Sequence, residues 1–362
     1  MRRAVKQVVV IAAGLMAFAA GFPQSACAQY YKGKTITMIV NYPPGGPTDI
    51  EGRIVAQHLP QHVPGQPTVV VKNVGGGSGL LGSNELGDAT PDGLTIGFFT
   101  LDVMAELTDN PSVRTHFSDF MLIAGVESPL VVYIRKDTPP GINVPADLMT
   151  THDFKALSLN AQNINSINQE ISLDLLGIKY QAVPAYRGLK EVETAILQNT
   201  GQMANTSLSG WLGSAEPSMK DIVIPLWQLA PRGKTGDYPR SRSLPNMPTF
   251  EEFYTSVMKG SKPLAEDSRY QAMRAASDPQ LAMFRVAVLP PKSTGEAVTV
   301  MRTAFDDLWK DQGFLNDYSR VLATQPIMVS GSDGQQILVD LGKVPRKIKD
   351  FLIDYTTRIT EK

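Results

Sequence analysis

Two glycine-rich loops contain the groups of this sequence that are best suited to bind a ligand. Residues 42–46, Tyr-Pro-Pro-Gly-Gly, follow the apolar run 35–40, and residues 75–79, Gly-Gly-Gly-Ser-Gly, follow the run 68–71. Each loop precedes a helical pattern, so it offers bare N–H groups and the positive end of a helix dipole to an anion. Neither loop contains Lys or Arg. The pattern predicts binding of a carboxylate through neutral dipoles and water; the alternative is that these glycines only permit tight turns.

Groups for covalent or metal chemistry are scarce. The sequence has one Cys and four His and no Gly-x-Ser-x-Gly nucleophile elbow. His58 and His62 have the spacing of two metal ligands on one helical face, but Pro60 lies between them and the Glu of a metalloprotease motif is absent. We therefore predict no catalytic residue and no metal site, and we assign the two histidines to an exposed helix end.

The run 77–82 supports one enzymatic alternative. It reads Gly-Ser-Gly-Leu-Leu-Gly, a full G-x-G-x-x-G, and Asp102 follows it by twenty residues at the end of a later strand. That context is typical of a dinucleotide-binding loop, and the alternative is an NAD(P)-dependent oxidoreductase. Against it, the motif belongs to the second strand–helix unit instead of the first, and we expect no cofactor.

Alternating strand and helix patterns set the fold class. Strands are expected at 35–40, 68–71, 94–99, 130–134, 156–159, 180–184 and 221–228, and helices at 49–59, 80–89, 164–176, 189–198 and 297–309. Thr48 or Asp49 suits the N-cap of the first helix. This alternation predicts an α/β fold with mainly parallel sheets, and the carboxyl ends of such strands are where ligands bind.

Composition excludes several classes of protein. The chain has 362 residues, with 34 Lys and Arg against 35 Asp and Glu, so it lacks the basic field that nucleic-acid binding requires. Its length is typical of about two domains, and a single Cys excludes a disulfide scaffold.

Residues 1–28 have the layout of a secretory signal. Arg2, Arg3 and Lys6 precede an apolar run of about 13 residues, which is shorter than the roughly 20 of a membrane span. A cut after Ala28 would leave 31 basic and 35 acidic residues, a net charge of −4, and no Cys. We expect export to the periplasm.

Five short motifs resemble one family in their order along the chain. Residues 42–49 (Tyr-Pro-Pro-Gly-Gly-Pro-Thr-Asp), 73–82, 91–95 (Pro-Asp-Gly-Leu-Thr), 183–188 and 244–249 (Leu-Pro-Asn-Met-Pro-Thr) are similar to blocks of the tripartite tricarboxylate transporter substrate-binding proteins, the Bug-type receptors. The resemblance implies a two-lobed periplasmic-binding-protein-like fold with crossover hinge segments. The expected parts are lobe 1 at 29–130, lobe 2 at 131–242 and a returning part at 243–362, with a helical insertion near 254–284.

The resemblance also implies the ligand and the residues that bind it. We expect a non-enzymatic monomer that captures a small mono-, di- or aromatic carboxylate and delivers it to membrane transporter subunits; a ligand-sensing adaptor for a signalling partner is the further alternative. The residues expected to bind the ligand are Tyr42, Pro44, Gly45, Gly46, Thr48, Asp49, Gly77, Ser78, Ser158, Asn160, Asn163, Tyr186, Asn205 and Thr206.

Overall fold

Runs of β-branched and apolar residues build two separate β-sheets in the computed structural model, which describes residues 30–360. The expected signal peptide and its cut site lie outside the described residues. The first sheet has the order β11-β4-β10-β3-β1-β2. Its strands are β1 (Thr35–Val40), β2 (Thr68–Asn73), β3 (Thr95–Thr100), β4 (Met121–Glu127), β10 (Arg285–Leu289) and β11 (Ile327–Ser330).

The second sheet has the order β7-β6-β8-β5-β9. Its strands are β5 (Leu130–Arg135), β6 (Lys155–Ser158), β7 (Gln181–Pro184), β8 (Met203–Ser207) and β9 (Val223–Leu229). Every residue of β5 is buried, as expected for a strand covered on both faces.

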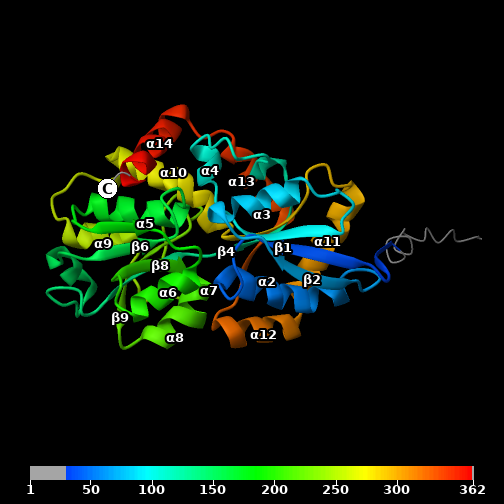
Figure 1. Cartoon of the computed structure of the whole chain (residues 1–362), viewed down its shortest axis with the longest axis horizontal. Coiled ribbons are helices and arrows are strands. Elements are labelled where there is room, and N and C mark those ends of the chain that lie inside the picture. The colour runs from blue at the N-terminus through cyan, green and yellow to red at the C-terminus, as the bar shows by residue number, and fades with distance from the viewer. Residues whose placement is uncertain (1–29, 361–362) are drawn as a thin grey trace, which may run out of the picture.

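Helices flank both sheets and, with them, form two lobes (Figure 1). The helices around the first sheet are α2 (Pro47–His58), α3 (Leu80–Gly87), α4 (Met104–Leu107), α11 (Gly295–Leu308), α12 (Gln312–Leu322) and α13 (Gly331–Leu341). Those around the second are α5 (Ile164–Leu175), α6 (Leu189–Leu197), α7 (Leu208–Gly210), α8 (Glu216–Met219), α9 (Phe250–Val257) and α10 (Ser268–Ala282). The last helix, α14 (Arg346–Thr360), packs against α10 and α4 and so touches both lobes.

The predicted two-lobed α/β fold is confirmed: each sheet is mixed, and its core strands are mostly parallel. The strands β1–β3 pair in parallel, and so do β6–β8. In contrast, β5 and β10 are antiparallel to both of their neighbours. These are the two strands that the chain enters after crossing from the other lobe, at residues 128–129 and 283–284. They therefore run against the strands that are joined by helices within one lobe.

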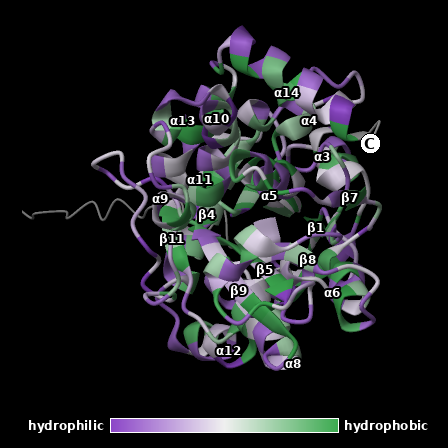
Figure 2. Cartoon of the chain, turned by 90° about the vertical axis from the view of Figure 1, so that its left-hand side faces the viewer, coloured by the Kyte–Doolittle hydropathy of each residue, from purple (hydrophilic) through white to green (hydrophobic). Residues whose placement is uncertain are grey.

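The helices are amphipathic, which explains how they cover the sheets. In Figure 2 many of them, α14 among them, alternate hydrophilic and hydrophobic residues along the ribbon. None of the helices in the described range 30–360 combines the length and the apolar content that crossing a membrane requires.

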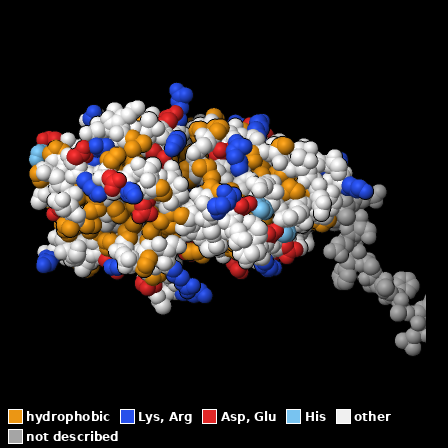
Figure 3. Space-filling view, turned by 90° about the horizontal axis from the view of Figure 1, so that it is seen from below, with side chains coloured by type: hydrophobic (Ala, Val, Ile, Leu, Met, Phe, Trp, Pro, Cys, Tyr) orange, Lys and Arg blue, Asp and Glu red, His pale blue; other side chains and the backbone are white. Residues whose placement is uncertain are grey.

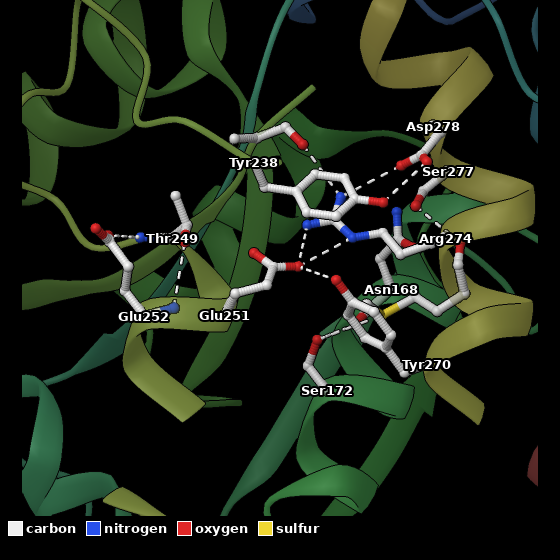
Figure 4. Close-up of polar contacts among 12 residues, drawn as sticks. Asn168, Ser172, Tyr238, Thr249, Glu251, Glu252, Tyr270, Arg274, Ser277 and Asp278 are labelled. Atoms are coloured by element: carbon white, nitrogen blue, oxygen red, sulfur yellow. Dashed lines mark hydrogen bonds and ion pairs between the residues drawn. The ribbon is translucent and has the colours of Figure 1, made fainter. Parts of the chain in front are cut away.

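Residues 254–284 belong to the second lobe, and their second half, which contains most of α10, is largely buried whereas the first half is largely exposed. They comprise the end of α9, a loop and α10, which packs along α5 and α14. Arg274 of α10 is only 4% exposed; its guanidinium forms an ion pair with Glu251 of α9 and stacks 3.6 Å from the ring centroid of Tyr238 (Figure 4). It also donates to the carbonyl of Ala230 at 3.1 Å. The segment is helical, as expected, and it is fastened to the lobe by a buried charge.

The first helix begins earlier than predicted. Gly46 is the N-cap of α2 and Pro47 its first residue, so the assignment of Thr48 or Asp49 as N-cap is wrong. Proline suits the first helical position because its φ is already helical and its missing N–H would have no partner there. The Asp49 carboxylate instead accepts a hydrogen bond from Gly45 N–H in the loop before α2.

Candidate functional site

A cavity of about 210 Å³ lies between the two lobes. The first lobe contributes the loop after β1, Thr100 at the end of β3, and Arg285 at the start of β10. The second lobe contributes Asn165 in the first turn of α5 and residues 188–191 at the start of α6. Because both lobes line this space, a ligand within it would connect them.

Asn41 holds the ends of two parallel strands together beside the cavity. Its Nδ2 donates to the carbonyl of Thr100 at 3.0 Å, and its Oδ1 accepts from the backbone N–H of Thr100 at 3.0 Å. Gly79 has a φ of +93°, and a Cβ there would collide with the Asn41 side chain. This glycine of the second loop is therefore needed for close packing.

Asp49 braces the first loop from behind. Its Oδ2 accepts from Gly45 N–H at 2.8 Å and from Arg53 Nε at 2.9 Å, and its Oδ1 accepts from Asn73 Nδ2 at 2.9 Å. Burial by itself raises the pKa of Asp49, but the hydrogen bonds from Arg53, Gly45 and Asn73 outweigh it, so the net pKa lies below its usual value. Both oxygens thus serve to shape the loop.

Two helices present uncapped N-termini to the cavity. The N-caps of α2 and α6 are Gly46 and Gly188, which line the cavity and provide no side-chain cap. First-turn N–H groups have no partner within their own helix, and the positive end of the helix dipole adds to their attraction for anions. The start of α5 differs, because the Asn163 Oδ1 accepts from Asn165 N–H at 3.0 Å and from Ser166 N–H at 3.4 Å.

Arg285 adds a buried cation to the cavity wall. The residue is 2% exposed, and its Nη2 lies 2.8 Å from Oε1 of Glu51, which is also 2% exposed. Its Nη1 donates to Thr100 Oγ1 at 3.0 Å and its Nη2 to Ser207 Oγ, on the second lobe, at 3.3 Å. The Nε has no hydrogen-bond partner among residues 30–360. An unpaired buried donor costs about 1–3 kcal/mol, so an acceptor on a ligand would relieve that cost.

Glu51 is held by both lobes as well. Ser209 on the second lobe donates to its Oε1 at 2.6 Å, and Tyr318 of α12 donates to its Oε2 at 2.9 Å. The Arg285–Glu51 pair and its hydroxyl partners therefore join the lobes directly beside the cavity.

A void of about 10 Å³ adjoins the cavity on the second lobe, where amides and hydroxyls collect. Asn165 lines both spaces. Ser158, Asn163, Ser166 and Asn205 also line the void. The hydroxyls of both serines and the Oδ1 atoms of Asn165 and Asn205 are buried, and in the described part of the chain they have no hydrogen-bond partner.

A second cavity between the lobes, of about 460 Å³, lies on the side of α3 and α14. It is lined by Gly77, Ser78 and Asn160, and the Asn160 Nδ2 donates to Ser78 Oγ across the cleft at 2.5 Å. Asp102 and Glu106 are its carboxyl groups. No basic side chain is among the described residues that line it.

The sequence-predicted residues therefore divide between separate places. The first cavity brings together Tyr42, Pro44, Gly46 and Thr48, with Gly45 and Asp49 bracing them; the void holds Ser158, Asn163 and Asn205. The second cavity holds Gly77, Ser78 and Asn160.

Two further predicted residues do not line any of these spaces in the described structure. Tyr186 is half-buried and donates its N–H to the carbonyl of Ser158 at 3.3 Å. Thr206 is buried on β8, and its hydroxyl has no hydrogen-bond partner in the protein.

Sequence reasoning missed Arg285, Thr100 and the start of α6. A signal was present for the first of these, because Arg285 is a lone charge between Phe284 and Val286 in an apolar run that reads as a buried strand. Such a charge is rarely buried without a partner or a function.

The surface field does not explain how an anion would be attracted. Basic and acidic side chains are interspersed on the face seen in Figure 3. The local groups that could attract a carboxylate are the two helix N-termini, Arg285 and Lys190, and the Glu191 carboxyl also lines the cavity.

Comparison with curated proteins gives two partial matches, and no protein-family model matches the chain. The chain is 30% identical over 178 residues to the UPF0065 protein in the TAR-I ttuE-ttuC' intergenic region of Agrobacterium vitis, covering 46% of this chain and 49% of the relative. It is 37% identical over 83 residues to protein BugT of Bordetella pertussis, covering 23% of this chain and 25% of the relative. The chain thus spans half or less of the length of these relatives. They confirm the resemblance to Bug-type proteins.

Comparison with solved structures covers nearly the whole chain and shows the fold. The periplasmic binding protein BugD matches with a TM-score of 0.63 at 16% identity, over 91% of this chain and 98% of that one. A Rhodopseudomonas palustris protein solved with adipate gives 0.66 at 16% identity, over 88% and 97%. MatC of the same organism, solved with malate, gives 0.60 at 17% identity, over 89% and 99%.

Proposed function

We propose that this relative of the Bug-type proteins is a periplasmic solute receptor, which captures a small carboxylate between its lobes and passes it to a membrane transporter. The observation that carries the proposal is the cavity of about 210 Å³ in which the uncapped N-termini of α2 and α6 meet the buried Arg285. These groups are complementary to a single carboxylate. The folds of BugD, MatC and the adipate-bound protein, two of which were solved with dicarboxylates, support the same class of ligand.

The binding step requires no chemistry on the ligand. Carboxylate oxygens accept hydrogen bonds from the first-turn N–H groups and from the Nε of Arg285, directly or through water, which is energetically close to a direct bond. Because the ligand contacts both lobes, its binding energy favours the arrangement in which they are closed. The surface formed by the two closed lobes is then what a transporter subunit would recognise.

The NAD(P)-dependent oxidoreductase alternative is less well supported, because Asp102, the carboxylate that it requires, already has partners within the protein. The Asp102 carboxylate accepts from Met104 N–H at 3.0 Å, from Asn163 Nδ2 at 2.7 Å and from Ile164 N–H at 3.4 Å. It is therefore committed to holding α5, whereas a dinucleotide site needs this carboxylate for the hydroxyls of a ribose.

A thermal-shift screen followed by titration calorimetry tests the receptor proposal. We expect organic carboxylates to raise the melting temperature, because a ligand at about 100 times its Kd adds about 2.7 kcal/mol to the free energy of unfolding. If NAD(P) stabilises the protein and no carboxylate does, the oxidoreductase alternative replaces the proposal.

The Gly46→Val variant tests whether the ligand binds in the cavity of about 210 Å³. Gly46 has an ordinary φ of −85°, and a Cβ there meets only the Pro43 carbonyl at 3.9 Å, so valine should fold and extend into the ligand space. We expect affinity to fall at least about tenfold, or about 1.4 kcal/mol. Gly295→Val is the matched control, because Gly295 also lies at a helix start with nothing near its Cβ position but is on α11, away from the cavity. Equal affinities in the two variants would place the ligand elsewhere.

A further inference from the structure

The start of α5 is closed to anions, unlike the starts of α2 and α6. Asn163 Oδ1 accepts from the N–H groups of Asn165 and Ser166, and Asp102 Oδ2 accepts from that of Ile164 at 3.4 Å. The first-turn donors of this helix are thus used inside the protein. The place that a second carboxylate of a ligand would take at this helix is already held by a carboxylate of the chain itself.

Asp102 reaches this position from the opposite lobe. It follows β3 of the first lobe, and its Oδ2 accepts from Asn163 Nδ2 at 2.7 Å. Among the residues that the structure describes, its partners are backbone N–H groups and this amide, so dipoles and no cation balance its charge. The same Asn163 Nδ2 donates to the hydroxyl of Tyr42 at 3.2 Å, and Tyr42 lines the ligand cavity. The side chains of Asn163 and Tyr42 therefore connect the Asp102 carboxylate to the ligand cavity, and Asn163 itself lines the adjoining void.

Two unpartnered amide oxygens beside α5 require hydrogen-bond donors, whereas the unpartnered hydroxyls of Ser158 and Ser166 in the same void can donate or accept. Asn205 is 4% exposed, and its Nδ2 donates to the carbonyl of Asn165 at 3.1 Å and to Gln169 Oε1 at 3.0 Å. These two bonds fix the amide and leave its Oδ1, an acceptor, without a partner. The Oδ1 of Asn165, which is 5% exposed and lines both the cavity and the void, is also unpartnered.

We propose that the ligand is a monocarboxylate whose far end carries a hydrogen-bond donor, such as a hydroxyl, an amide or an ammonium group, and that Asp102 excludes a second carboxylate. This inference rests on the proposed function and narrows its ligand class. The carboxylate binds at α2, α6 and Arg285. The donor end reaches the void of about 10 Å³, which has room for about one small polar group, and satisfies Asn165 and Asn205. A carboxylate in the same place could accept from the hydroxyls of Ser158 and Ser166, but it would also meet the two amide acceptor oxygens and the nearby negative charge of Asp102.

Isosteric ligand pairs test the proposal directly. Succinate and succinamate differ only in having a carboxylate or a primary amide at one end, and adipate and adipamate differ in the same way. We expect each half-amide to bind wild-type protein at least about tenfold more tightly than its diacid in calorimetry at pH 8. That pH keeps the ligands ionised, and it also keeps Asp102 ionised, since burial raises the pKa of this group to about 7 despite its three hydrogen bonds.

The Asp102→Asn variant tests whether the Asp102 carboxylate causes the preference for half-amides over diacids. This variant should narrow the preference for the half-amide to about threefold or less, because it removes the charge and keeps the side-chain shape. Glu106→Gln is the matched control: it neutralises another carboxyl of the same lobe that lines the 460 Å³ cavity but binds Phe117 N–H at 2.6 Å instead of α5. The preference should be unchanged in this control.

The possible outcomes distinguish a failure of the receptor function from a failure of the proposed ligand class. If no carboxylate of any kind binds, the receptor function fails. If carboxylates bind but the diacids bind wild-type protein as tightly as the half-amides, only the present inference is overturned, whether or not the Asp102 variant folds. An undiminished preference in folded Asp102→Asn would overturn the role given to Asp102.

Discussion

Arg285 and Glu51 place two opposite full charges in the interior between the lobes. The pair is 2.8 Å apart, and hydroxyls of both lobes surround it, with Ser209 and Tyr318 on Glu51. Removing a buried charge from water is costly, and the attraction between the partners repays this cost only while both are present. A buried pair of this kind therefore contributes more to the uniqueness of an arrangement than to its stability.

Arg285→Met should destabilise the protein by about 3–5 kcal/mol, because it leaves the Glu51 charge buried without a cation. The double variant Glu51→Gln with Arg285→Met should recover most of that loss, since neither charge remains. Urea denaturation of the two variants measures the difference. Equal destabilisation of both would show that packing of the arginine stem, and not charge, accounts for the effect.

At the scale of elements, the positions of several strands and helices follow from local sequence, whereas those of elements that pack against residues distant in the chain do not. The run 35–40 was predicted as a strand and is β1, and 164–176 was predicted as a helix and is α5 at Ile164–Leu175. The strand β4 was not predicted, and it contains Gly125, a residue that weakens strands. A Cβ at Gly125 would lie 2.9 Å from the Met283 side chain. The glycine is therefore explained by close packing against a residue 158 positions later in the chain.

The two helices α9 and α10 depend on one buried charge, which gives a prediction at the element scale. The side chain of Arg274 is 5% exposed in its pair with Glu251, so Arg274→Met should cost about 3 kcal/mol or more. Arg240 pairs with the adjacent Glu252 at 2.7 Å but is 40% exposed, and Arg240→Met should cost about 1 kcal/mol or less. Chemical denaturation compares the two, and similar losses would contradict the anchoring role of Arg274.

At the scale of the whole molecule, Asp102 links the stability of the folded protein to pH. Burial raises its pKa to about 7, above the value near 3.9 of an unfolded chain, although Met104, Ile164 and Asn163 lower it by hydrogen bonding. The folded protein therefore binds this proton more tightly than the unfolded chain does. The stability that this group contributes is fully present below about pH 4 and is lost as the pH rises towards about 7.

Comparison of wild-type protein with Asp102→Asn isolates this effect. The free energy of unfolding of wild type relative to the variant should fall between pH 4 and pH 7, by at most about 1.4 kcal/mol per pH unit, and level off above pH 8. Denaturation at pH 5, 6, 7 and 8 provides the measurement. A difference that does not change with pH would mean that Asp102 has the same pKa in the folded and unfolded states.

The sequence by itself determined the α/β class and the loop after the first strand, because each depends on residues close together in the chain. Its composition determined the scarcity of Cys and His, and the two-lobed plan came from the resemblance of five motifs to one family. Tertiary structure alone decided which of these residues share a cavity. It placed Gly77 and Ser78 on a different cavity from Tyr42, brought Arg285 to the loop at residues 42–48, and set Asp102 against the start of α5. These residues come together only where the two lobes meet, after the chain has crossed between them. The periodicity of a short segment does not indicate which distant segment it will contact.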